Sequence, residues 1–357
     1  MMSERTFNHG RRFVQGWYWA LPSRDLGWGQ AVPLRLMGRD LALYRTLDGR
    51  AIALDAVCPH MGALLSQGRV AGDRLLCPLH RWAFDPQGRC AHIPAQPGVE
   101  SPGVRSWPTA ERYGLIWIWT GEGAPLPLPY APELRDEPCD ARVGPAFHKN
   151  CHPNVLLINA IDAHHFNSVH NLPLDIVFRT EGLADGAIAF HNTTRGGDES
   201  WLIRLIRRFY REAVTYSLCY WYGSSGTVTL GPDFLHFYIL FALRPTEAGH
   251  TEGRTILLTR RRSRWWGKAF NQLVLGLTQQ VGNYFAKGDT QVFQTIQFDF
   301  QTPLQADRSI LEFVQHVEQQ PALHWQTWQP VETSPAVIPA SAPAPGAIAE
   351  VRQGVTP

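Results

Sequence analysis

The sequence lacks several features that would assign it to other classes of protein. Its 357 residues contain no run of 18 apolar residues, so we predict no membrane-spanning helix. The net charge of +2 is too small to indicate nucleic-acid binding, and neither half of the chain is strongly acidic or basic. There is no internal repeat and no glycine-rich nucleotide loop of the Rossmann type, so we expect no dinucleotide-binding domain of that kind.

Cysteine is sparse, with six residues in the whole chain, which excludes a disulfide framework. Two of the six stand beside histidines, which indicates metal binding in a reducing, cytoplasmic environment. The first residues carry charges but no apolar segment follows them, so a signal peptide is not expected. The other four cysteines are predicted to be buried structural residues: Cys90, Cys139, Cys151 and Cys219.

The length and composition are those of a globular protein. A chain of 357 residues suggests two ordinary domains or one large one, and 44% hydrophobic residues suffice for a sizeable core. We predict the following division: an N-terminal arm at 1–15, an all-β domain at 16–122, a linker at 123–145, an α+β domain at 146–331 and a disordered Pro/Ala-rich tail at 332–357.

Short strands and tight turns fill the first domain. The runs Leu41–Thr46 and Ala51–Leu54 flank Asp48-Gly49, which is a strong hairpin pattern. The run Leu115–Trp119 is entirely apolar, as expected for a strand buried on both faces.

Helical and strand-like patterns are mixed in the second domain. A helix is predicted from Asn159 to His170, ending at Asn171-Leu172-Pro173. Strand-like runs occupy 186–262, and further helical patterns occupy roughly 264–286 and 307–319. The predicted fold is therefore α+β, with an antiparallel sheet flanked by helices.

The first metal-type motif joins Cys58-Pro-His60 to Cys77-Pro-Leu-His80, with sixteen residues between them. Two loops that each provide one thiolate and one imidazole can hold a two-iron cluster, with two cysteines on one iron and two histidines on the other. Zinc in a Cys₂His₂ site is the rival, although zinc fingers place both cysteines in one knuckle. Four unligated residues are the other alternative.

The second motif places Asp162, His165 and His170 within one predicted helix. At 3.6 residues per turn, Asp162 falls between the two histidines, about 60° from one and about 80° from the other. His164 points about 160° away from Asp162 and is rejected as a ligand. Two histidines and one carboxylate form the facial triad that holds Fe(II) with open positions for dioxygen. The alternative is a set of ordinary histidines on a helix.

The carboxylate of this triad has more than one candidate. Asp162 could serve, but Asp289 follows the 264–286 pattern and leads into another apolar stretch that could pack against residues 159–170. Asp289 could instead be a capping or turn residue, and Asp299 is a further candidate ligand.

Together, the two motifs resemble the oxygenase (alpha) component of Rieske non-haem iron oxygenases over roughly residues 14–300. The branch most similar contains ketosteroid hydroxylases, vanillate-type demethylases and chlorophyll-pathway oxygenases. The segments that carry this likeness are Gly16-Trp17-Tyr18, Cys77–Phe84, Gly88–Pro94 and Tyr113–Trp117.

The resemblance implies a role for each residue. It implies a Rieske [2Fe–2S] cluster in the first domain and a mononuclear Fe(II) held by His165, His170 and Asp289. It assigns Asp162 to a bridge from His80 of one subunit to His165 of the next in a homotrimer. Two departures are Arg81, where many members have Gly, and Ile158, where many have Glu.

The activity implied is that of a terminal oxygenase, a monooxygenase or dioxygenase fed by a separate ferredoxin or NAD(P)H-dependent reductase. We expect hydroxylation of a hydrophobic, bulky cyclic substrate, with demethylation, desaturation or cyclisation as alternatives on the same iron. A Rieske electron carrier or redox sensor is the alternative from another class. Aromatic candidates for the substrate pocket are Phe209, Tyr216, Tyr220, Trp221, Phe234, Phe237 and Tyr238.

The segment from Arg260 to Phe270 allows two interpretations. It combines four arginines and a lysine with Trp265, Trp266 and Phe270. The favoured interpretation is a packed helix with a solvated basic end. The alternative is a helix that lies on a membrane surface, where basic and aromatic residues gather.

Overall fold

The computed structural model describes residues 6–10, 12–170, 176–183, 186–192, 215–231, 235–246 and 250–323. Several expectations lie outside these residues: the tail at 332–357, the helix end at 171–173, and the pocket candidates Phe209 and Phe234. In the described part of the chain, no helix is long and apolar enough to cross a membrane.

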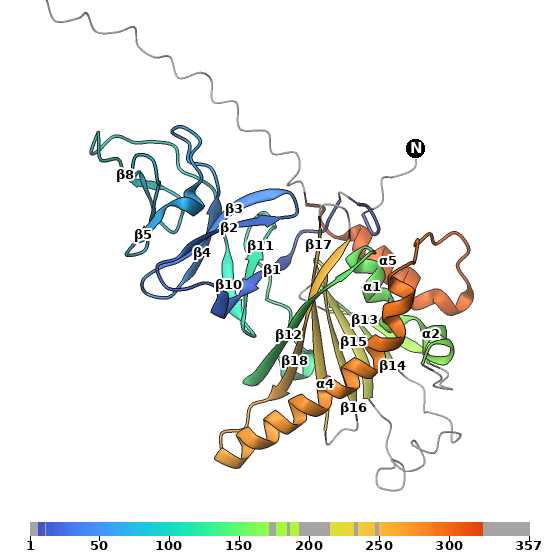
Figure 1. Cartoon of the computed structure of the whole chain (residues 1–357). Helices are drawn as coiled ribbons and strands as arrows, with labels where there is room; N and C mark the ends of the chain where they lie inside the picture. Colours follow the sequence, from blue (N-terminus) through green and yellow to red (C-terminus); the bar gives the residue numbers. More distant parts are fainter. Residues whose placement is uncertain are drawn as a thin grey trace, which may run out of the picture. The chain divides into compact units, whose positions relative to one another are not determined.

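The N-terminal part is built from three small antiparallel sheets (Figure 1). The first has the order β1 (Trp17–Pro22), β11 (Leu115–Trp119), β10 (Thr109–Arg112). The second has the order β2 (Ala31–Leu36), β3 (Arg39–Arg45), β4 (Ala51–Asp55), β9 (Ser106–Trp107). The third has the order β5 (Arg69–Ala71), β6 (Arg74–Leu76), β7 (Ala83–Phe84), β8 (Cys90–His92). Short 3₁₀ helices η1 (Ser23–Asp25) and η2 (Leu65–Gln67) join them.

Two local predictions for this part are confirmed. Strands β3 and β4 pair as a hairpin, and Gly49 in their turn has φ +93°, a conformation that glycine adopts without a steric penalty. Strand β11 is buried at all five positions, as its unbroken apolar run predicts.

The second part is one seven-stranded antiparallel sheet with helices against it, which confirms the predicted α+β class (Figure 1). Its order is β12 (Cys139–Lys149), β18 (Thr251–Arg260), β17 (Phe237–Pro245), β16 (Ser225–Gly231), β15 (Thr215–Trp221), β14 (Ile188–Asn192), β13 (Phe178–Gly182). The helices are α1 (Pro153–Ile158), α2 (Ala163–Ser168), α4 (Trp265–Phe293) and α5 (Arg308–Gln319), with 3₁₀ helices η3 (Pro132–Leu134), η4 (Asn159–Ile161) and η5 (Gln305–Asp307).

The two faces of this sheet are different environments because side chains alternate along each strand. Tyr220 of β15 packs in an apolar cluster with residues of α1 and α5. Trp221 and Tyr238 instead belong to a cluster with the tryptophans of β1 and β11. Those two aromatic residues therefore face away from the helices, which corrects their choice as pocket candidates.

Two element boundaries need correction. Strand β12 begins at Cys139, inside the segment predicted as a linker to 145, and pairs with β18 along its length. The helix predicted at 264–286 continues to Phe293, because Gly288 lowers helix propensity without ending the helix. The helix predicted at 307–319 is confirmed as α5.

Of the four cysteines predicted to be buried structural residues, two are corrected. Cys151 and Cys219 are buried, as expected. Cys90 and Cys139 are only partly buried, because each lies on a strand at the edge of its sheet.

Candidate metal centres

The two Cys/His loops of the N-terminal part fold alike. In the first, Cys58 N–H donates to Ala63 O at 2.9 Å and Gly62 N–H donates to Cys58 O at 3.0 Å. In the second, Cys77 N–H donates to Trp82 O at 2.9 Å and Arg81 N–H donates to Cys77 O at 3.1 Å. The sequence spacing therefore corresponds to two matching turns, each presenting one thiol and one imidazole.

These four side chains gather with thiols inside and imidazoles outside. Cys58 and Cys77 are buried in one apolar cluster, whereas His60 and His80 are exposed, with ring centroids 4.7 Å apart. Burial raises the pKa of the Cys58 thiol to about 11, so a thiolate there needs a cation beside it. Two buried sulfurs and two outer nitrogens suit a Rieske cluster, which has one sulfur-bound and one nitrogen-bound iron.

Trp82 is a residue of this site that the sequence analysis did not assign. Its ring stacks on His60 with centroids 4.5 Å apart and planes within 8° of parallel. Stacking fixes the orientation of the imidazole, which is the task of a supporting residue around a metal ligand. The only sequence signal was its place directly after the second loop.

Arg81 carries backbone strain that offers a test of the loop geometry. Its φ is +58°, and the equivalent residue of the first loop, Gly62, has φ +77°. We expect Arg81→Gly to raise the free energy of unfolding by about 0.5–1 kcal/mol, because the left-handed cost of about 1–2 kcal/mol exceeds the entropy that glycine adds to the unfolded chain. Denaturant unfolding of the cluster-loaded protein measures this.

The matched control is Arg81→Ala, which removes the same charged side chain and keeps the Cβ atom. Alanine is expected to give no stabilisation. An equal gain in both variants would attribute the effect to the arginine side chain and contradict the backbone explanation.

The segment from Asn159 to His170 is not the single helix that was predicted. Helix α1 ends at Ile158, η4 follows, and Asp162 adopts extended backbone angles of φ −81° and ψ 103°. Its carboxylate accepts hydrogen bonds from His164 N at 3.0 Å and His165 N at 3.2 Å, so Asp162 is the N-cap of α2. The calculated arrangement of Asp162 between the two histidines on one helical face is therefore wrong, because local capping replaced continuous helix.

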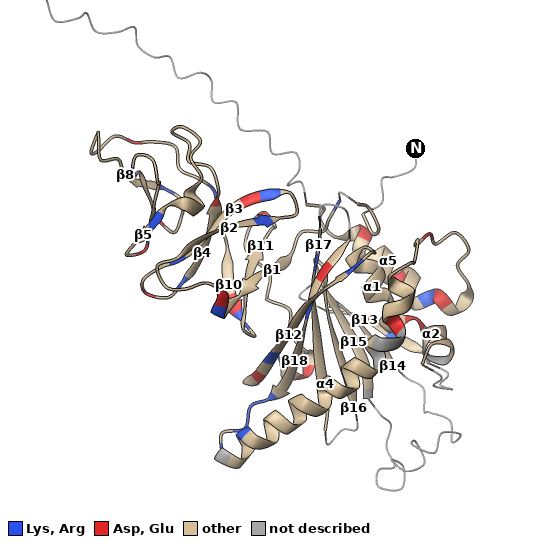
Figure 2. Cartoon of the chain, viewed as in Figure 1, with Lys and Arg blue, Asp and Glu red and all other residues tan. Residues whose placement is uncertain are grey.

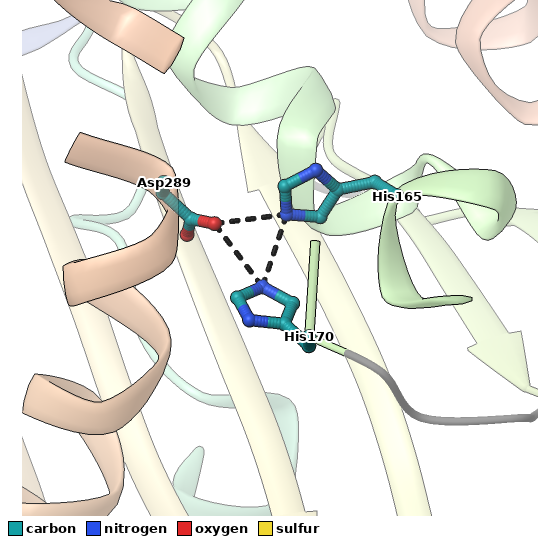
Figure 3. Close-up of side chains that lie close together, drawn as sticks. All are labelled: His165, His170 and Asp289. Carbon is teal, nitrogen blue, oxygen red and sulfur yellow. Dashed lines mark hydrogen bonds and ion pairs between the residues drawn. The ribbon is translucent and has the colours of Figure 1, made fainter. Parts of the chain in front are cut away.

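Asp289 of α4 lies beside His165 of α2 and beside His170 in the turn that follows α2 (Figure 3). Asp289 Oδ1 is 2.8 Å from His165 Nε2 and 3.1 Å from His170 Nε2, and the two nitrogens are 3.0 Å apart. Three ligands at adjacent corners of an octahedron, each about 2.1 Å from the metal, stand about 3.0 Å apart. The three atoms thus fit a facial triad.

Hydrogen bonds alone cannot account for these three contacts. If both histidines donate from Nε2 to Asp289, two N–H groups face each other across 3.0 Å. If one Nε2 is unprotonated, it turns a lone pair toward the carboxylate at close range. Burial also lowers the pKa of His170, which favours the neutral imidazole that binds a metal. A cation in the middle satisfies all three atoms.

Asp162 and Asp299 lie outside this group of three. Asp299 is exposed and accepts from the Gln301 side chain. The structure therefore brings Asp289 to the histidines, while Asp162 caps the helix that carries His165. Asp289 lies within α4 rather than after a helix, which corrects its expected local setting.

Strand β15 and helix α5 hold the backbone that leads to this site. Tyr216 donates to Ala160 O at 2.9 Å, Tyr220 donates to Leu157 O, and Ser309 donates to Ile161 O at 2.8 Å. Each bond satisfies a carbonyl where α1 and η4 break the helical ladder. These contacts, which the sequence did not reveal, fix the segment before Asp162.

The chain is similar to several known proteins. Residues 16–108 match the Rieske [2Fe-2S] domain family. Aminopyrrolnitrin oxygenase PrnD of Pseudomonas fluorescens is 35% identical over 136 residues, which are 35% of this chain and 37% of that protein. The oxygenase component of 3-ketosteroid-9-alpha-monooxygenase of Rhodococcus rhodochrous is 30% identical over 222 residues, which are 60% of this chain and 57% of that protein.

The overall fold also has a solved counterpart. Dicamba monooxygenase bound to 3,6-dichlorosalicylic acid superposes with a TM-score of 0.60 at 24% identity, covering 87% of this chain and 97% of that chain. Another structure of dicamba monooxygenase contains non-haem iron.

The chain thus carries a Rieske [2Fe–2S] domain on the fold of the Rieske non-haem iron oxygenases. It is related to proteins that are oxygenase components of that class. The matched segments span only 37% and 57% of the two curated relatives named above.

Proposed function

We propose that this protein is the terminal oxygenase of a multicomponent Rieske system and hydroxylates a hydrophobic, bulky cyclic substrate with O₂. The observation that carries the proposal is the triangle of His165, His170 and Asp289 in the same chain as a Rieske domain. A Rieske electron carrier would need the cluster alone and would have no use for a buried two-histidine, one-carboxylate group.

The proposed ligands divide between the two centres. Cys58 and Cys77 hold one iron of the cluster, and His60 and His80 hold the other. His165, His170 and Asp289 hold a mononuclear Fe(II), which supplies open coordination positions for O₂ when bound. We also propose the domain limits given by the sequence, with the linker ending where β12 begins, at Cys139.

Asp162 is proposed as a positioning and bridging residue. Its carboxylate orients the start of α2, the helix that presents His165. In a homotrimer it would connect His80 of one subunit to His165 of the next. A ring is the assembly that closes such head-to-tail contacts.

The substrate is proposed to lie on the sheet face that carries the helices. Tyr216 and Tyr220 face this side, and Phe237 shares it by strand alternation with Ile239 and Phe241. Ile158 is buried in the same apolar layer. An apolar surround favours a hydrophobic cyclic substrate.

Oxidative demethylation is the second candidate reaction, because two relatives are named as O-demethylases, of vanillate and of dicamba. The electron donor is proposed to be a separate ferredoxin or NAD(P)H-dependent reductase in the cytoplasm.

The test combines metal analysis with product analysis. The isolated protein is expected to hold about three irons per chain, two in the cluster and one mononuclear. With a surrogate reductase and ¹⁸O₂, one substrate from a panel of sterols, aromatics and pigments should gain labelled oxygen or lose a methyl group. Two irons per chain with no substrate-dependent O₂ uptake would support the electron-carrier alternative, and turnover of small polar acids only would contradict the substrate class.

A further inference from the structure

An exposed apolar stripe runs along α4, the helix that also carries Asp289. Its members are separated by three, four or seven residues, so at about 100° per residue they fall within a sector of about 60°. They and their exposed fractions are Trp266 (50%), Phe270 (38%), Leu273 (58%), Leu277 (44%) and Tyr284 (61%).

A different side of the same helix attaches it to the sheet. Val274, Leu275 and Thr278 are buried, and α4 packs against β17, β18 and β12. Asn271 is also buried and donates to Asp140 of β12 at 2.8 Å. The exposed stripe is therefore not the face by which α4 packs on the sheet, because another face of the helix makes that contact.

Isolated exposed leucines are ordinary, but a contiguous set is not. An aromatic side chain has an area of about 150–250 Å², so Trp266 and Tyr284 alone leave on the order of 200 Å² in water. The sequence had favoured a packed helix with a solvated basic end. Helix α4 does pack against the sheet, and its side chains Trp266 and Phe270 are exposed.

Positive charge gathers at the start of the stripe. From residue 260 to residue 288 the chain has six cationic and no acidic side chains: Arg260, Arg261, Arg262, Arg264, Lys268 and Lys287. Figure 2 shows blue at the beginning of α4 and tan over most of the helix that follows.

Part of this charge is balanced within the chain and part is not. Arg260 pairs with Glu137 at 3.7 Å, and Arg261 pairs with Asp140 at 2.7 Å. Within the described residues, Arg262 and Arg264 make no ion pair with a carboxylate. Both lie over stripe aromatics, and Arg262 also donates a hydrogen bond to Asn271 Oδ1 at 2.8 Å. The Arg262 guanidinium is 4.5 Å from the Phe270 ring centre, and that of Arg264 is 5.9 Å from the Trp266 ring centre.

We propose that this face of α4 docks on the surface of an anionic phospholipid membrane. The stripe enters the boundary between headgroups and acyl chains, and Arg262 and Arg264, which have no carboxylate partner among the described residues, contact lipid phosphates. Trp266 and Tyr284 stand near the two ends of the stripe, and their amphipathic rings suit the headgroup level. A bilayer matches both features, since it offers apolar depth and negative charge over the whole length of the helix.

The experiment is flotation of the full-length, iron-loaded protein with two vesicle types, phosphatidylcholine alone and phosphatidylcholine with phosphatidylglycerol. Flotation is expected with the phosphatidylglycerol vesicles, and high salt is expected to weaken it because salt screens exposed charges. Absence of flotation with these vesicles at low salt would overturn the proposal.

Substitutions locate the contact. Leu273→Gln combined with Leu277→Gln is expected to lower vesicle binding by about tenfold or more, since each leucine loses apolar burial in lipid. The control is Leu311→Gln, which changes a comparably exposed leucine (42%) on α5 and should leave binding unchanged. Iron content and circular dichroism of each variant verify the fold.

The same variants distinguish a subunit contact. If the double substitution changes the oligomeric mass in solution and leaves flotation intact, the stripe is an interface between copies and the membrane proposal is wrong. Equal flotation on both vesicle types, insensitive to salt, would contradict the role of the arginines.

Discussion

Replacing His165 by alanine is expected to abolish mononuclear iron binding and to leave the Rieske cluster intact. The variant keeps only His170 and Asp289, and two ligands cannot define a facial triad. Loss of supporting residues around metal ligands already costs about 10–100-fold in affinity or activity, so loss of a ligand should lower product formation by more than about 100-fold. Iron analysis should fall from three to two per chain, with an unchanged electron-spin signal of the reduced cluster.

His164→Ala provides the matched control. His164 is the adjacent residue on α2, is exposed and does not belong to the group of three. The control should retain iron and turnover. Retention of mononuclear iron by His165→Ala, or its loss in both variants, would overturn the ligand assignment.

Asp162→Asn is expected to keep both metal centres and to lose most of its steady-state turnover. Asparagine caps a helix as well as aspartate, so α2 and His165 should remain in place. What disappears is the negative charge proposed to join His80 of one subunit to His165 of the next. We expect turnover to fall by about 10–100-fold, the range for residues that support metal ligands.

Two measurements distinguish the effect of the negative charge of Asp162 from the effect of its role as the N-cap of α2. The optical signal of the reduced cluster should persist longer in Asp162→Asn than in the wild type after mixing with substrate and O₂. Asp162→Ala removes the cap as well, so it should also lose about 1 kcal/mol of stability. Normal turnover in Asp162→Asn would contradict the bridge assignment, but it would not contradict the assignment of the iron ligands.

The two centres differ in how far apart in the sequence the segments that form them lie. Each cluster loop is held locally, because the backbone N–H and C=O of its cysteine make hydrogen bonds inside its own turn. The triangle of His165, His170 and Asp289 depends on α4 lying along the sheet beside α2, with 118 residues between His170 and Asp289 in the sequence. Substitutions that shift α4 should consequently disturb the mononuclear site before the cluster.

The sequence by itself determined the features that depend on residues close together along the chain. The two Cys/His loops, the hairpin at Gly49, the buried run of β11 and the amphipathic pattern of α5 follow from short spacings and alternation, which act within a few residues. The α+β class followed from the same local patterns.

The tertiary structure decided what depends on the approach of distant segments. It distinguished the roles of Asp289 and Asp162. Helix α4 carries Asp289 to the histidines, whereas the carboxylate of Asp162 accepts hydrogen bonds from two backbone N–H groups of α2. It also decided which side of α4 meets the sheet and which side stays in water. Helical periodicity shows that a helix has faces, but only packing against β17 and β18 selects the buried one.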